Sequence, residues 1–180
     1  MAGPRDILRP HPTILFVGIN PGATSGRVGH HFAGPGNPFW KLLHAAGLTS
    51  RELAATEDLT LVDHGHALVN LCTRTTRTAA ELTKDELARG RRRLLAIIEE
   101  LAPEVVALVG VTLYPIVFGA AAARASPGPG PKPERPGDAR LFVVPNPSGL
   151  NATFPTFAAK LPWFEQLRTF AYGRPGRSRG

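Results

Sequence analysis

The chain has 180 residues, of which 43% are hydrophobic, and it carries a formal net charge of +7 and a single cysteine, Cys72. Length and composition indicate one globular domain with a full core, and no stretch approaches the roughly 20 apolar residues that span a bilayer. One cysteine excludes an internal disulfide and an iron–sulfur cluster held within one chain, while the basic balance favours an anionic partner such as nucleic acid.

The first predicted element is a buried strand. Thr13–Val17 is a continuous apolar and β-branched run, which is typical of strands buried on both faces of a parallel sheet. The run ends in Gly18-Ile19-Asn20-Pro21-Gly22, and Pro21 biases the backbone of Asn20 away from the helical region. We therefore expect one amide side chain fixed at the carboxyl end of a strand, the edge at which open α/β sheets bind ligands.

Helices and strands are then predicted to alternate along the chain. The expected elements, in order, are a glycine-rich loop at 23–36, a helix at 37–47, a strand at 67–71, a helix at 83–102, a strand at 105–110 and a helix that ends near 123. Asn37 is expected to cap the first helix, and Thr83-Lys84-Asp85-Glu86 is a capping box that opens the second. This alternation predicts the α/β class, a three-layer α/β/α sandwich around a central four-stranded parallel sheet.

The last part of the chain contains a fourth strand. Residues 126–138, rich in proline, glycine and charge, are expected to form a mobile surface loop. Leu141–Pro145 is an apolar strand that runs into Asn146-Pro147-Ser148-Gly149-Leu150-Asn151, and residues 154–172 are mostly helical in pattern. We divide the chain into a leader at 1–12, one domain at 13–172 and a basic flexible tail at 173–180.

Two Asn-Pro loops thus follow strands of the same kind. A single Asn-Pro pair is an ordinary turn signal. If both strands are parallel members of one sheet, however, both loops lie at the same edge and can face one cleft. Two such loops at matching strand ends therefore favour a functional site.

These motifs resemble a known family. Gly18–Gly22 together with Asn146–Leu150 resembles the mismatch-specific uracil/thymine-DNA glycosylases, a branch of the uracil-DNA glycosylase superfamily, and Phe32–Lys41 and Asn70–Thr76 are similar to it as well. Order and spacing agree from about residue 12 to about residue 170. The resemblance implies a sheet order of 2-1-3-4 and a DNA repair enzyme that removes uracil from mismatched duplex DNA by base flipping, with thymine and etheno-cytosine as further candidate substrates.

The resemblance also implies roles for single residues. Asn20 would orient the attacking water through its carbonyl oxygen, because an amide has no pKa suited to a general base. Asn146 would face the departing base, and Phe32 would stack on the flipped base, a contact worth about 1–3 kcal/mol. The same comparison places further residues around the base: Gly18, Ile19, Ser25 and Asn70.

On the DNA side, Gly149-Leu150-Asn151 would supply the wedge that fills the hole left by the flipped base and contacts the orphaned partner, usually guanine. The family often has an arginine two positions after this leucine, where this chain has Ala152. Arg74 or the tail would compensate, and Arg74 and Arg77 are candidate ligands of DNA phosphates. The run Arg91–Arg93 is either a solvated helix face or a second phosphate track.

We expect no metal and no cofactor. His30-His31 and His64-Gly65-His66 come without a clear set of further ligands, and no motif places an amine for a Schiff base. The expected partner is double-stranded DNA with mismatched or damaged pyrimidines. We expect the protein to bind this DNA as a monomer and not to associate with a membrane. The N-terminus shows no apolar signal segment, so we expect a cytoplasmic protein, associated with the nucleoid if bacterial.

Two other functions stay open at this point. A non-catalytic module that binds mismatched or damaged DNA would have the same fold, but it would not need both Asn20 and Phe32. An unrelated α/β hydrolase of small molecules would leave Leu150 without a purpose, and the chain shows no Ser/His/Asp arrangement for it.

Overall fold

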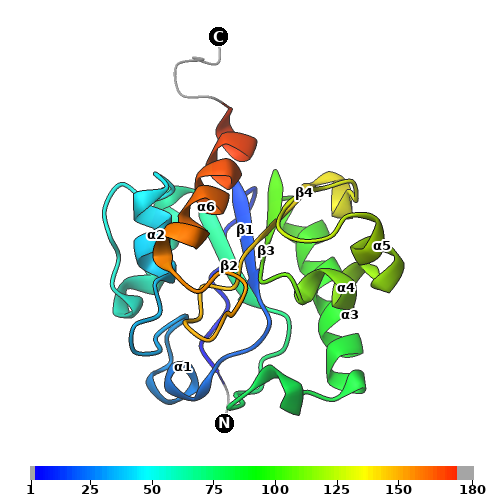
Figure 1. The fold of residues 1–180 in the computed structure, drawn as a ribbon, viewed down its shortest axis with the longest axis horizontal. Helices are drawn as coiled ribbons and strands as arrows, with labels where there is room; N and C mark the ends of the chain where they lie inside the picture. The colour runs from blue at the N-terminus through cyan, green and yellow to red at the C-terminus, as the bar shows by residue number, and fades with distance from the viewer. Residues whose placement is uncertain (1–2, 174–180) are drawn as a thin grey trace.

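A computed structural model describes residues 3–173 and shows an α/β fold of three layers (Figure 1). The sheet has the strand order β2-β1-β3-β5-β4. The strands are β1 (Ile14–Gly18), β2 (His66–Asn70), β3 (Val105–Val109), β4 (Gly130–Lys132) and β5 (Arg140–Val144). All except β4 are parallel, so the expected order 2-1-3-4 is found, with β5 as the fourth parallel strand.

Helices cover both faces of the sheet. They are α1 (Ala23–Val28), α2 (Phe39–Ala45), α3 (Lys84–Leu101), α4 (Leu113–Phe118), α5 (Ala120–Ala125) and α6 (Phe157–Tyr172), with short 3-10 helices η1 (Ala55–His64), η2 (Ala79–Glu81) and η3 (Pro136–Asp138). Helices α2 and α6 lie on one side of the sheet and α3, α4 and α5 on the other (Figure 1). The expected three-layer sandwich is confirmed.

The four parallel strands are buried on both faces, as the apolar runs predict. In β1, Ile14 and Phe16 belong to the core cluster under α2 and α6, whereas Leu15 and Val17 belong to the cluster under α3 and α4. This alternation follows from the two-residue period of a strand. It leaves the polar residues of the strand-loop junctions at the carboxyl edge of the sheet.

The capping box at the start of α3 is confirmed. Thr83 Oγ1 accepts a hydrogen bond from the Glu86 N–H over 3.2 Å, and a carboxylate oxygen of Glu86 accepts from the Thr83 N–H over 2.8 Å. The helix ends at Leu101, and its C-cap Ala102 has a left-handed backbone directly before Pro103. Helix α3 is thus anchored at the end that approaches the loop following β2.

The loop predicted at 126–138 is wrong in part. Residues 130–132 form β4, which pairs antiparallel with β5 at the edge of the sheet. Pro131 is tolerated there because an edge strand has one row of backbone groups without strand partners. Lys132 further ties the segment together by donating to Ser126 O and Gly128 O over 2.6 and 2.7 Å. Pairing with the next strand of the chain outweighs a composition typical of loops.

Two other predicted boundaries also differ. The expected loop at 23–36 contains the short helix α1, which brings Ser25 to a buried position. The single helix expected after β3 is divided at Gly119, whose φ of 98° is unfavourable for other residues, into α4 and α5. Neither change alters the layer order.

The segment predicted as a leader packs on the domain. Ile7 is 2% exposed and pairs with Leu68 of β2 through two backbone hydrogen bonds of 2.8 Å. An apolar residue without periodic neighbours gives no signal of this pairing in the sequence. Of the predicted tail, residues 174–180 lie outside the described residues.

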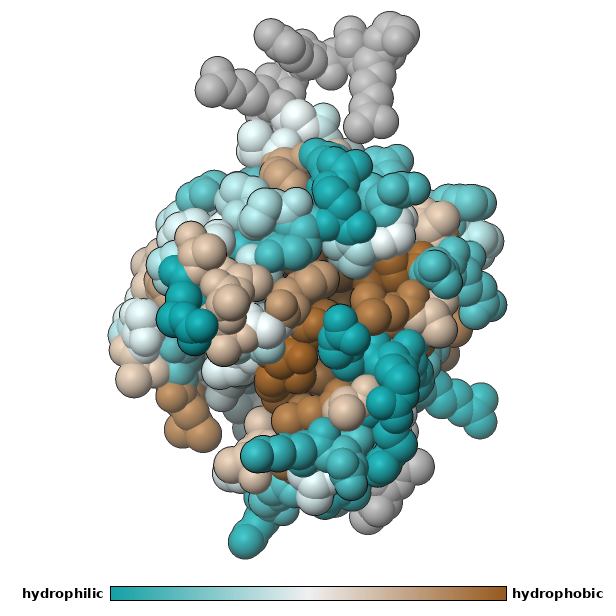
Figure 2. All heavy atoms as spheres, turned by 90° about the vertical axis from the view of Figure 1, so that its right-hand side faces the viewer, coloured by the Kyte–Doolittle hydropathy of each residue, from teal (hydrophilic) through white to brown (hydrophobic). Residues whose placement is uncertain are grey.

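The side of the molecule with α4 and α5 has apolar surface at its centre. Figure 2 shows a hollow of apolar surface on this side, bordered by hydrophilic side chains. Partly buried apolar residues of the two helices, Ile116, Phe118, Ala122 and Ala123, pack against the core cluster below. Within residues 3–173, none of the helices has both the length and the apolar character needed to cross a bilayer.

His66 should make the fold sensitive to acid. Its ring is fully buried and donates from Nε2 to Leu48 O over 2.9 Å, and burial lowers its pKa to about 4. Because the unfolded chain has a higher histidine pKa of about 6.5, it binds the proton first, and stability is lost as the pH falls from about 6.5 towards 4. The expected loss from this residue is about 3 kcal/mol.

Urea unfolding of wild type and His66→Phe across this pH range measures the effect. The variant should show a flatter dependence of the free energy of unfolding on pH. If both proteins lose stability equally on acidification, other groups are responsible and the prediction is wrong.

Candidate active site

The two Asn-Pro loops face one cavity, as predicted from their places after parallel strands. In Figure 1 the loop between β5 and α6 lies beside the segment that follows β1. Between them is a cavity of about 450 Å³. Its lining contains most of the predicted site residues: Gly18, Ile19, Asn20, Ser25, Phe32, Asn70, Arg77, Asn146 and Leu150. Gly149, Asn151 and Arg74 do not line it.

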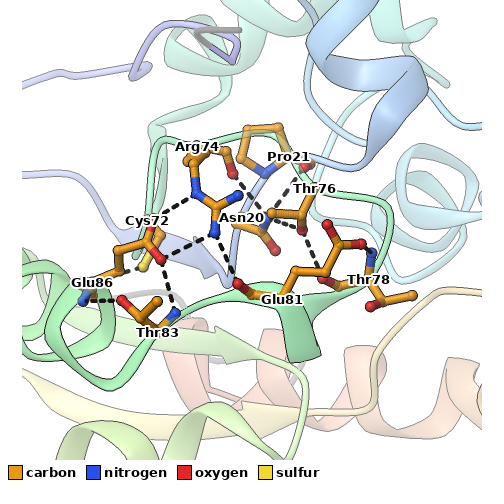
Figure 3. A network of polar contacts seen from close by, with 9 residues as sticks. All are labelled: Asn20, Pro21, Cys72, Arg74, Thr76, Thr78, Glu81, Thr83 and Glu86. Atoms are coloured by element: carbon orange, nitrogen blue, oxygen red, sulfur yellow. Dashed lines mark hydrogen bonds and ion pairs between the residues drawn. The ribbon is translucent and has the colours of Figure 1, made fainter.

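Asn20 is held with its amide nitrogen towards the protein (Figure 3). Its Nδ2 donates to the main-chain oxygen of Arg74 over 2.9 Å and to Thr76 Oγ1 over 2.7 Å. The Thr76 hydroxyl donates onward to Thr78 O over 2.8 Å, so its oxygen is left to accept from Asn20. Both amide hydrogens are therefore used, and Asn20 Oδ1 is available as an acceptor that can orient a water molecule.

Phe32 has a rigid position on the cavity wall. Its ring stacks on Phe39 of α2, with ring centroids 4.0 Å apart and planes inclined by 24°. Its backbone has a φ of 50°, an uncommon conformation for a residue with a side chain. Strained backbone of this kind persists only where the surroundings fix it, and it is frequent at binding sites. Phe32 can thus offer a fixed aromatic surface to a flat ligand.

Asn70 presents an acceptor at the cavity. The buried His31 donates from Nε2 to Arg5 O over 2.8 Å, which leaves its Nδ1 to accept from Asn70 Nδ2 at 3.5 Å. Burial lowers the pKa of His31, which favours this neutral form of the ring. Asn70 Oδ1 consequently lies beside Gly18, where it can receive an N–H group of a ligand.

Gly18 is tightly enclosed, so Gly18→Ala should damage the cavity. An added Cβ would lie 2.4 Å from Asn70 Oδ1 and 3.5 Å from the Phe32 ring. Since Asn70 is buried and held by His31, it cannot yield freely. The kcat/KM of the reaction that this cavity supports should fall at least about tenfold, with a stability loss of about 1–3 kcal/mol.

Gly22→Ala is the matched control for this prediction. It lies in the same loop, has a φ of −74°, and has no atom within 4 Å of an added Cβ. Because Gly22 also lines the cavity, the comparison is made on stability: the free energy of unfolding of Gly22→Ala should equal that of wild type. Equal losses in both variants would show that the loop tolerates no substitution, and the argument from Asn70 would fail.

In the second loop, Asn146 forms a turn and still has a free donor. Its Oδ1 accepts from the Ser148 N–H over 2.9 Å. This is the Asx-turn that any Asn-Pro sequence can form. The turn uses only the oxygen end of the amide, so Nδ2 is available at the cavity for a ligand oxygen.

Leu150 and Asn151 have different environments. Leu150 is 94% exposed, an unusual position for a large apolar side chain. Asn151 is bound within its own loop, because Nδ2 donates to Asn146 O and Oδ1 accepts from the N–H groups of Thr153 and Phe154. Leu150 therefore projects from a loop that Asn151 holds together.

A buried lysine supports the same loop. Lys160 of α6 is 2% exposed, and its Nζ donates to Ser148 O over 3.3 Å. Burial lowers its pKa. The amine contacts the main chain of the loop and does not line the cavity.

The two predicted phosphate ligands also differ. The guanidinium of Arg74 forms an ion pair with Glu86 and donates to Glu81 O. Arg77 lines the cavity, is exposed, and has no hydrogen-bond or ion-pair partner among residues 3–173. Of these two arginines, Arg77 is therefore the one whose guanidinium is free to bind an anion.

Few titratable groups reach the cavity. Within the part of the chain that the structure describes, His31 and Arg77 are the titratable side chains in its lining. No cluster of three or more His, Cys, Asp or Glu side chains suited to a metal ion occurs among residues 3–173. The chemistry available in the lining is that of amides, hydroxyls and backbone groups.

Sequence reasoning did not identify several residues that position the site. Thr76 and His31 orient Asn20 and Asn70, and Lys160 supports the second loop. Thr76 lies in the segment 70–76, whose similarity to the family was the one signal available. His31 and Lys160 act through contacts with residues far away in the chain, which no local pattern indicates.

The comparison with protein families agrees with this geometry. Residues 6–168 of the 180 match the model of the uracil DNA glycosylase superfamily. The matched range contains all five strands and both Asn-Pro loops. This chain therefore belongs to the uracil DNA glycosylase superfamily.

Proposed function

We propose that this protein is a monofunctional DNA glycosylase of the mismatch-specific uracil/thymine type, which removes uracil from mismatched duplex DNA. Its superfamily indicates a hydrolase that acts on uracil in DNA. The proposal adds the mismatched duplex, the hydrolytic mechanism and the residue roles. The observation that carries it is the Asn20 amide, which is locked with Oδ1 unpaired in the cavity that Phe32 and Asn146 also line.

The base first has to leave the helical stack, because its glycosidic bond is out of reach inside a duplex. In the cavity, the Phe32 ring would stack on the flipped base. Asn70 Oδ1 would accept the N3–H of uracil or thymine. A weakly paired base in a G·U or G·T mismatch costs less to extrude than one in a Watson–Crick pair, which supports mismatched substrates.

Bond cleavage then needs charge stabilisation and a placed water. The bond between C1′ and the base nitrogen breaks with its electron pair going to the base. The Asn146 Nδ2 group would donate a hydrogen bond to the resulting anion. Water held by Asn20 Oδ1 adds to the cationic C1′, and the proton it loses balances the protonation of the released base. Both assisting groups are neutral amides, so a modest rate is expected.

The lining supports hydrolysis over an enzyme–DNA imine. Among residues 3–173, no lysine lines the cavity, and the nearby Lys160 amine contacts the loop main chain. Water is therefore the nucleophile in this proposal, and the product is an uncut strand with an abasic site.

The DNA-facing roles follow from exposure. Leu150 would enter the stack, and the backbone around Gly149 would face the orphaned base, since the Asn151 side chain is used within the loop. Arg77 would contact a phosphate next to the flipped nucleotide. These roles suit a monomer that binds duplex DNA at this edge of the sheet.

The test is a cleavage assay with labelled duplexes that contain one G·U, A·U, G·T or G·ethenoC pair. The strand should be cut at the modified position only after alkali treatment, and fastest for G·U. Cutting without alkali would contradict monofunctional hydrolysis. Mismatch binding without release of any base would overturn the enzyme and leave the alternative, a non-catalytic module for damaged DNA.

A further inference from the structure

We propose that the Arg74–Glu86 ion pair positions Asn20 for catalysis, and that Arg74 is not a phosphate ligand. This inference rests on the proposed function, because it explains how the water-orienting amide is held. It assigns a positioning role to Glu86, a helix residue remote from the base, and changes the expectation for Arg74. The network is drawn in Figure 3.

The first link is the main chain of Arg74. Asn20 Nδ2 donates to Arg74 O over 2.9 Å, so the orientation of the amide depends on this carbonyl as well as on Thr76 Oγ1. The segment belongs to the connection between β2 and α3, which has no regular structure of its own at residue 74 apart from an isolated bridge position. Main-chain hydrogen bonds from the Cys72 N–H to Ile19 O and from the Thr76 N–H to Pro21 O hold the segment on either side, which leaves residue 74 itself to be held by its side chain.

The second link is the side chain of the same residue. Arg74 Nε donates to one carboxylate oxygen of Glu86 over 2.6 Å, and Nη2 donates to the other over 3.1 Å. Nη2 also donates to Glu81 O over 2.9 Å. A two-point arginine–carboxylate contact restricts orientation as well as distance. The backbone of Arg74 is thereby tied to α3 and to η2.

Glu86 is itself anchored by the start of α3. Its carboxylate also accepts from the Thr83 N–H, so it caps the helix while it binds Arg74. These contacts, first that with Arg74 and then that with Thr83, lower the pKa of Glu86 to about 2. The carboxylate therefore stays ionised wherever the enzyme is folded and active.

Helix α3 also holds the beginning of the same connection. Arg93, about two turns after Glu86, donates from Nη1 to Asn70 O over 2.9 Å and pairs with Asp6. At Gly90 the helix touches the chain directly, since an added Cβ would lie 2.5 Å from Leu71 O. The connection is thus fixed to α3 at both Asn70 and Arg74, and Asn20 is bound at the second of these points.

The same contacts argue against a phosphate role for Arg74. Its guanidinium would have to leave Glu86, and the unpaired carboxylate would then repel the phosphate. Arg77 has no such competing partner among residues 3–173. Two arginines three positions apart therefore have different functions.

The Glu86→Gln variant separates the two roles, because they predict opposite signs. If Arg74 positions Asn20, losing the carboxylate should slow base release about 10–10²-fold at saturating protein, as expected for a displaced catalytic group. If Arg74 binds phosphate, freeing it should strengthen DNA binding and leave the rate unchanged or higher. Single-turnover release of uracil from a G·U duplex decides between these outcomes.

The salt dependence of binding gives a second readout. Arg74→Gln should leave the slope of log Kd against log salt unchanged, whereas Arg77→Gln should reduce its magnitude by about 0.9, the value for one phosphate contact. A reduced slope for Arg74→Gln would overturn the proposal.

Thr83→Ala is the control for helix fraying. It removes the other half of the capping box, with a stability loss of about 1 kcal/mol, but leaves Arg74 and Glu86 paired. Its rate should equal that of wild type. If Thr83→Ala is as slow as Glu86→Gln, loosening of α3 explains the effect and the positioning role is wrong.

A measurement without catalysis separates this inference from the proposed function. The Asn20 side-chain amide protons, observed by NMR in the free protein, should exchange faster with solvent in Glu86→Gln than in wild type or Thr83→Ala. Unchanged exchange would overturn the positioning role. If the wild-type protein releases no base, this result contradicts only the proposed function.

Discussion

Asn20→Ala is expected to lower the single-turnover rate of uracil release from a G·U duplex by about 10²–10³-fold, the usual cost of losing one preorganised polar group at a reacting centre. The alanine removes the acceptor that orients water. Asn146 cannot replace it because its oxygen is used in a turn, and Asn70 Oδ1 accepts from the base in this proposal. DNA binding should change little, since Asn20 does not face the backbone in this proposal. A rate close to that of wild type would contradict the assigned role.

Asn20→Asp provides a sharper comparison. A carboxylate would place an oxygen where Nδ2 now donates to Arg74 O, and a carbonyl cannot donate back. This environment disfavours the ionised form, so the variant carboxyl should retain its proton to higher pH. Its rate should therefore rise with pH, while the wild-type rate above neutrality should be flat. Parallel pH profiles would show that the amide is not locked as described.

Leu150→Ala is expected to lower uracil release from a G·U duplex by about 10–10²-fold without changing stability. The side chain is 94% exposed, so the fold does not depend on it. In the complex it would fill the space left by the flipped base and offset an unstacking cost of a few kcal/mol. A single-stranded oligonucleotide has no duplex stack in which a flipped base would leave a space. The rate of uracil release from it should therefore be unaffected.

The matched control is Leu59→Ala. Leu59, in η1, is 63% exposed and does not line the cavity, so the same chemical change there should have no effect on either substrate. The measurement is the ratio of duplex to single-strand rates for each variant. If Leu150→Ala slows both substrates equally, the residue acts on the cavity itself and not as a wedge.

The fold was largely predictable because its signals are local. The buried run at Thr13–Val17 and the capping box at Thr83–Glu86 each depend on neighbours within a few residues. By contrast, the pairing of β4 with β5 joins a Pro- and Gly-rich stretch to a strand edge, and the docking of Ile7 on Leu68 joins residues 61 positions apart. Such pairings depend on which edges the assembled sheet exposes.

The site divides in the same way. Two Asn-Pro turns after parallel strands predicted that Asn20 and Asn146 would share one cavity, because parallel strands end at the same edge of a sheet. The sequence could not predict which end of the Asn20 amide faces that cavity. Its partners Arg74 and Thr76 lie 54 and 56 positions away, in a connection that the parallel pairing of β2 with β1 brings beside Asn20.

What this sequence determined by itself is the α/β class, the order of most elements and the group of side chains at the carboxyl edge. Local periodicity and turn chemistry are sufficient for these. Only the tertiary structure decided that Arg74 is paired with Glu86 while Arg77 is free, and that Asn151 braces a loop from which Leu150 projects. The reason is that a charged or amide group can bind several kinds of partner, and the partner is chosen by distances that exist only after folding.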